Sequence, residues 1–92
     1  MKIITTNEFS FELKVVVLYI AKDSINKAKE FKNTLYLELK NLDFMPYRNR
    51  ESIYYDDEDI RDMIFKGYVI IYKIDNSKNS IFVLNIIKNR VY

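Results

Sequence analysis

The side chains able to do chemistry in this 92-residue chain are carboxylates, hydroxyls, amines and guanidinium groups, because it contains neither histidine nor cysteine. These two absences exclude disulfides, thiolate and imidazole metal ligands, and Cys-His or Ser-His-Asp catalysis. A tyrosine remains possible as a base, but its pKa of about 10 would have to be lowered by cationic neighbours.

The carboxylates are concentrated in the run 56–59, of sequence DDED. This run lacks the alternating oxygen ligands and the glycine of a calcium-binding loop. We therefore interpret it as a solvated connector and expect neither a metal nor a cofactor. Arg48 and Arg50 lie just before it and are its candidate ion-pair partners.

The last third of the chain is locally basic. From residue 60 onward, Asp62 and Asp75 are outnumbered by Arg61, Lys66, Lys73, Lys78, Lys88 and Arg90. This excess could favour an acidic protein or a nucleic acid. The alternative is a solvated strand face with no ligand.

Two helices are predicted in the first half of the chain. The second begins after Ser24, a typical N-cap, and must end before Pro46, because proline disfavours the helical region for the residue preceding it. Its apolar stripe comprises Ala28, Phe31, Leu35, Leu39 and Leu42. The first helix follows a cap at Thr6 or Asn7. Its stripe comprises Phe9, Leu13, Val16 and Ile20. The short joint between them predicts an antiparallel helical hairpin.

The remaining segments favour strands. A short β-branched strand is predicted over residues 2–6, and three further strands over 60–65, 68–74 and 81–87. Lys66 and Gly67 fit a tight turn, and residues 75–79 form a second turn. Residues 47–58 show no periodicity and are interpreted as a connector. The predicted fold is a single α+β domain over residues 1–92, ordered β-α-α-β-β-β, with about four mainly antiparallel strands and the hairpin on one face.

No segment is predicted to cross a membrane. The longest apolar runs, residues 15–21 and 68–72, are far shorter than the roughly 20 residues that a spanning helix needs. The N-terminus also lacks the basic and apolar stretches of a signal peptide. We therefore expect a cytoplasmic protein.

The chain resembles the RelE/ParE superfamily of type II toxins in FELKVVVLYIAKDSINKAKEFKNTLYLELKNLDFMPYRNR, IRDMIFKGYVIIYKID and SIFVLNIIKNR. The shared features are a first helix ending in Tyr-Ile-Ala and a second helix with Ala and Phe near its start. They continue with an arginine opening the next strand and a Tyr-x-Ile-x-Tyr core after the turn. The segment IRDMIFKGYVIIYKI looks closer to ParE than to RelE.

The resemblance implies a growth-inhibiting toxin, of the kind that stabilises plasmids, held inactive in a hetero-oligomer with a cognate antitoxin. A ParE-like toxin would inhibit DNA gyrase by binding, and the residues expected to contact target or antitoxin are Arg61, Lys88, Arg90 and Tyr92. A RelE-like toxin would instead be an endoribonuclease that cleaves mRNA on the ribosome. A third alternative is an inactive binding module that only pairs with its antitoxin.

Residue comparison favours gyrase binding over RNA cleavage. Aligned on the Gly67-Tyr68 turn, the positions at which RelE-type toxins carry lysines and an arginine fall near Ile60, Asp62 and Val69. A metal-free ribonuclease needs cations against its charged transition state, and an anionic Asp62 would destabilise that state. If the chain were nevertheless a ribonuclease, its catalytic candidates would be Arg61, Lys66, Arg90 and Tyr92.

Overall fold

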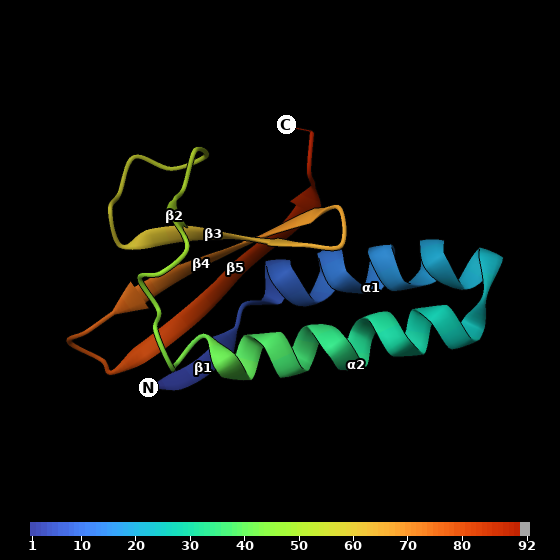
Figure 1. The fold of residues 1–92 in the computed structure, drawn as a ribbon, viewed down its shortest axis with the longest axis horizontal. Helices are drawn as coiled ribbons and strands as arrows, with labels where there is room; N and C mark the ends of the chain where they lie inside the picture. Colours follow the sequence, from blue (N-terminus) through green and yellow to red (C-terminus); the bar gives the residue numbers. More distant parts are fainter. Residues whose placement is uncertain (91–92) are drawn as a thin grey trace.

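The computed structural model describes residues 1–90, and five strands form one sheet with a helical hairpin against one face (Figure 1). The elements are β1 (Lys2–Thr5), α1 (Asn7–Asp23), α2 (Ile25–Asn41), β2 (Arg50–Glu51), β3 (Ile60–Phe65), β4 (Tyr68–Asp75) and β5 (Ser80–Lys88). The predicted fold is confirmed. The sheet has one strand more than expected, because two residues of the connector, β2, pair with β3.

The helix ends follow the predicted caps. The Thr6 hydroxyl accepts a hydrogen bond from the Phe9 N–H at 3.1 Å, and the Ser24 hydroxyl accepts one from the Lys27 N–H at 3.2 Å. Each cap satisfies a backbone donor that has no partner inside its helix. Leu42 is the C-cap of α2, one residue past the helix that was predicted to include it, and is still buried in the core.

The sheet has the order β1-β5-β4-β3-β2, in which β3, β4 and β5 form an antiparallel meander and β1 pairs parallel to β5. The β3–β4 turn has positive φ at both central residues, 46° at Lys66 and 85° at Gly67. This geometry matches the right-handed twist of a two-residue hairpin. A register shift in the β4–β5 pairing follows Ile71. The shift lies close to Ile86, whose N–H donates to the Glu12 carboxylate of α1 at 3.2 Å.

The two faces of the sheet bury different clusters. The main core lies between the helices and the sheet, where the largest buried side chains include Phe9, Leu35 and Tyr72. A smaller cluster of Ile60, Val69 and Ile71 lies apart from it. The strands alternate between these faces, so Tyr68 and Tyr72 both belong to the helix side.

Candidate functional site

A groove with apolar walls and a cationic rim lies between α1 and the end of the sheet. We call it the C-terminal groove; it has a volume of roughly 490 Å³ and is lined by Val15, Val16, Tyr19, Tyr68, Lys88 and Arg90. The pairing of β4 with β5 sets Tyr68 opposite Lys88, whose ammonium lies 5.2 Å from the centre of the Tyr68 ring. The Asn89 N–H donates to the Gly67 carbonyl at 2.9 Å and fixes the chain after β5 against the β3–β4 turn.

The helical wall of this groove is a feature that the sequence interpretation missed. Val15 and Tyr19 are 52% and 66% exposed, although Val16 between them packs against the main core. Phe11 and Leu18 are also exposed, so α1 carries apolar side chains on both its buried and its open sides. Exposed apolar side chains that gather on one side of a helix are typical of a surface that binds a partner. The signal in the sequence is the number of apolar residues outside the predicted stripe.

Three of the predicted site residues gather at one end of the sheet. Lys88 and Arg90 line the C-terminal groove, while Lys66 lies in the adjoining β3–β4 turn, with its ammonium 5.6 Å from the Phe65 ring. Arg61 is separated from Lys66 by five residues of strand, or roughly 16 Å at about 3.3 Å per residue. Tyr92 lies outside the described residues. The residues proposed together as ribonuclease candidates therefore do not all share one site.

Arg61 is engaged by the connector that follows α2. Its Nε donates to the Glu58 carbonyl at 3.0 Å, and its Nη1 donates to the carbonyls of Tyr47 and Asn49 at 3.2 and 3.1 Å. Its guanidinium carbon also lies 5.0 Å from the centre of the Tyr47 ring. These contacts hold two separate parts of the connector, so the guanidinium organises this loop.

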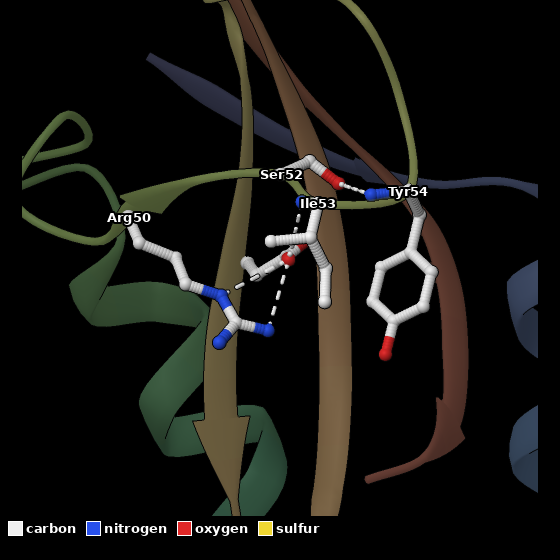
Figure 2. A network of polar contacts seen from close by, with 5 residues as sticks. Arg50, Ser52, Ile53 and Tyr54 are labelled. Atoms are coloured by element: carbon white, nitrogen blue, oxygen red, sulfur yellow. Dashed lines mark hydrogen bonds and ion pairs between the residues drawn. The ribbon is translucent and has the colours of Figure 1, made fainter. Parts of the chain in front are cut away.

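The other face of the sheet carries a buried ion pair. Asp62 has a side chain that is 0% exposed, and its Oδ2 accepts from Arg50 Nε at 3.2 Å and from the Ile53 N–H at 3.1 Å. Figure 2 shows the Arg50 side chain and the Ile53 N–H approaching this carboxylate from the same segment. Beside them, the Ser52 hydroxyl accepts a hydrogen bond from the Tyr54 N–H. The expectation that Arg50 pairs with the acidic run is wrong, because β2 pairs with β3 and sets Arg50 opposite Asp62.

The acidic run itself has local roles. Asp57 lies 3.8 Å from the Lys73 ammonium, and its carboxylate also accepts from the Asp59 N–H at 2.9 Å. The Asp59 carboxylate accepts from the Tyr47 hydroxyl at 2.9 Å. Within residues 1–90, no three potential metal-ligating side chains cluster together. The same residues contain no helix of the length and apolarity that crossing a membrane requires.

Comparison with known proteins decides the family. The family described as the ParE toxin of the type II toxin-antitoxin system, parDE, matches residues 3–90. The chain belongs to the ParE toxin family. Its fold is similar to that of a chain in the solved structure of the chromosomal ParDE TA system from P. aeruginosa, with a TM-score of 0.77 and 15% sequence identity. The similarity covers 96% of this chain and 95% of that chain. No curated protein sequence matches the chain significantly.

In this ParE-family chain, two tyrosines near the connector are poor candidates for a base. Burial is the largest cause that raises the pKa of Tyr72, outweighing the hydrogen bond from the Asn49 amide, which lowers it. Desolvation and the hydrogen bond to Asp59 likewise raise the pKa of Tyr47. Both hydroxyls therefore remain protonated donors at neutral pH, and Tyr72 donates to the Pro46 carbonyl at 2.6 Å.

Proposed function

We propose that this ParE-family toxin inhibits DNA gyrase by binding it, and that a cognate antitoxin neutralises it by covering the helical hairpin and the sheet. Toxin, antitoxin and gyrase would meet in the cytoplasm, where the toxin arrests growth. The observation that carries this proposal is that none of the three positions at which RelE-type toxins carry cations holds a cation in this chain. Ile60 and Val69 pack in an apolar cluster, and Asp62 is buried against Arg50.

These positions offer nothing that would stabilise a phosphate. The Asp62 carboxyl group supplies no positive charge, and the apolar cluster at Ile60 and Val69 supplies neither a proton donor nor a positive charge. The Arg50 guanidinium donates to that carboxylate, so its charge is already engaged there. This arrangement supports binding over RNA cleavage as the toxic mechanism.

The C-terminal groove has the chemistry of a protein-binding surface. Tyr19 and Tyr68 supply aromatic area, while Lys88 and Arg90 supply positive charge at the rim. Aromatic side chains contribute much of the energy of protein interfaces, and rim charges steer a partner of opposite sign. We therefore propose that this groove contacts an acidic segment of gyrase.

Two assays on the purified chain separate the possible targets. We expect loss of gyrase supercoiling and accumulation of gyrase–DNA cleavage complexes, with no codon-dependent cleavage of mRNA on translating ribosomes. Ribosome-dependent cleavage with unaffected gyrase would overturn the proposal and would make Arg61, Lys66, Arg90 and Tyr92 candidate catalytic residues. Harmless overexpression without antitoxin would instead identify an inactive binding module.

The groove is tested with a double charge reversal. K88E/R90E should weaken gyrase inhibition by at least about tenfold, because it repels an acidic segment at the rim. The control K2E/K78E makes the same change in net charge at two exposed lysines outside the groove and should retain inhibition. Equal inhibition by both variants would exclude the groove from the target interface.

The antitoxin is tested by co-expression with the protein of the adjacent reading frame. We expect a complex that co-purifies and growth that is restored. Failure of both results would exclude that protein as the antitoxin and remove the support for neutralisation.

A further inference from the structure

The loop between β2 and β3 carries exposed negative charge. It contains the acidic run, and Figure 1 shows it extending from one end of the sheet. The side chains of Asp56 and Glu58 are exposed and form no ion pair within residues 1–90. Tyr54 and Tyr55 come just before them and are 40% and 42% exposed. We call residues 54–58 the acidic loop; it presents two carboxylates without a counter-charge beside accessible aromatic area.

The C-terminal groove has the complementary chemistry. Tyr19 and Tyr68 line it from α1 and β4. Lys88 and Arg90 at its rim are exposed and form no ion pair in the described part of the chain. Its volume of roughly 490 Å³ lies within the range of about 300–1,000 Å³ that is usual for binding pockets. The groove therefore has room for several side chains of a loop.

One copy of the chain cannot bring these two surfaces together. Strand β3 begins directly after the acidic run, at Ile60, and ends at Phe65 beside the β3–β4 turn, which adjoins the groove. The two ends of this extended strand are roughly 16 Å apart, at about 3.3 Å per residue. Figure 1 shows the acidic loop and the β3–β4 turn at opposite ends of β3. The acidic loop can therefore enter the groove of another molecule but not its own.

We propose that two copies of this chain form a dimer in which the acidic loop of each copy sits in the C-terminal groove of the other. Exchange of the same two surfaces gives closed two-fold symmetry, the commonest arrangement of homo-oligomers. Asp56 and Glu58 would then meet the cationic rim twice in each dimer, and such opposite charges fix the orientation of a partner. A nucleic acid could neutralise the groove but not the loop, whereas a second copy neutralises both.

Such a dimer would regulate the toxin. The groove that we propose for gyrase is occupied in the dimer, so gyrase and a second copy would compete for Lys88 and Arg90. This consequence rests on the proposed function, whereas the association of two copies does not. A chain that cannot dimerise but keeps its groove should inhibit gyrase more strongly than the unmodified chain.

Sedimentation of the full chain over a wide range of concentrations measures the association. We expect a monomer–dimer equilibrium that added salt shifts toward the monomer. D56K/E58K and K88E/R90E should each raise the dimer dissociation constant by at least about tenfold, because each sets like charges against one another. The control K2E/K78E should dimerise as the unmodified chain does.

A mixture of the two reversed variants separates a lost contact from a folding defect. When D56K/E58K is mixed with K88E/R90E, the reversed loop meets the reversed groove and the native loop meets the native groove. A mixed dimer should therefore form nearly as tightly as the unmodified dimer. K2E/K78E has the same net charge as K88E/R90E, but its mixture with D56K/E58K should associate more weakly, because one of the two contacts pairs like charges.

The proposal is overturned if the unmodified chain stays monomeric, if it assembles beyond the dimer, or if either reversed variant dimerises as tightly as the unmodified chain. Failure of the mixed dimer to form would also overturn it.

Supercoiling assays distinguish this proposal from the proposed function. At concentrations at which the unmodified chain is dimeric, D56K/E58K should inhibit gyrase more strongly, and equal inhibition would overturn the competition for the groove. Dimers that behave as expected while gyrase is unaffected would overturn the proposed function alone. Loss of gyrase inhibition in K88E/R90E, with no dimer of the unmodified chain, would overturn the dimer alone.

Discussion

Replacing Arg50 with methionine should destabilise the fold more than replacing its partner Asp62 with asparagine. The Asp62 side chain is 0% exposed, whereas that of Arg50 is 38% exposed. R50M leaves a buried carboxylate whose remaining partner within residues 1–90 is the Ile53 N–H. D62N leaves a guanidinium that water can reach. The cost of an unpaired charge rises with its burial, so the two halves of this ion pair are not equivalent.

The magnitudes follow from what each variant leaves behind. Removing one partner of a buried ion pair lowers the free energy of unfolding by about 3–5 kcal/mol. Because the Ile53 N–H still donates to Asp62 in R50M, we expect a loss of about 3 kcal/mol. D62N weakens charge-assisted hydrogen bonds worth about 1.5–3 kcal/mol. D62N also removes the cost of burying a charged group, whose Oδ1 lacks a hydrogen-bond partner among the described residues, and this offsets part of the loss. We therefore expect a net loss of about 1 kcal/mol for D62N.

Urea unfolding of R50M, D62N and the double variant R50M/D62N measures these differences. If the buried charge is the cause, adding D62N to R50M should restore stability, although D62N alone reduces it. The control R48M changes an exposed arginine in the same connector and should stay within about 0.5 kcal/mol. The reasoning is refuted if R50M costs no more than D62N, or if D62N destabilises the R50M background further.

Three further perturbations each concern a single residue. Y72F leaves the Pro46 carbonyl without its 2.6 Å donor and should cost about 1–2 kcal/mol in urea unfolding. The pKa of Tyr72 is raised in the folded state, so its contribution to the free energy of unfolding is fully present below its usual pKa of 10.0. That contribution is lost as pH rises through the raised value, and Y72F should not show this alkaline loss of stability. G67A should lower the free energy of unfolding by about 1 kcal/mol in the same assay, because alanine disfavours the φ of 85° at this position. A Cβ would meet no other atom there, so backbone strain is the only cost. Hydrogen bonding by Ser77 lowers the pKa of Asp75, so its contribution is present above 3.8 and lost as pH falls through the lowered value; D75N should flatten this acid dependence in thermal melts.

The elements predicted correctly from the sequence are those with strong local signals. Thr6 and Ser24 cap the helices where their hydroxyls can accept the first free N–H groups, and Lys66-Gly67 turns the chain where glycine permits positive φ. The apolar stripes placed the helical hairpin against the sheet because residues three and four apart share a helix face. These features depend on neighbouring residues, so a single sequence contains them.

The features that were not predicted depend on contacts between distant residues. Strand β2 has two residues and no periodicity, and only its pairing with β3 brings Arg50 to Asp62. Arg61 could be placed on a strand, but its bonds to the carbonyls of Tyr47 and Asn49 depend on the path of the connector. The exposure of Tyr19 likewise follows from how much of α1 the sheet leaves uncovered.

The cations at the two ends of the sheet differ in what a partner would have to displace. Arg61 donates to three backbone carbonyls, so a partner that took its guanidinium would have to break those bonds and leave the carbonyls unpaired. Arg90 is exposed, and Lys88 has an aromatic ring as its neighbour and no ion pair within residues 1–90. A target can therefore gain charge contacts at the C-terminal groove without disrupting the fold. If replacing Arg61 abolishes the proposed gyrase inhibition, we would attribute the loss to a disordered connector. If replacing Arg90 abolishes it, we would attribute the loss to a missing contact with the target.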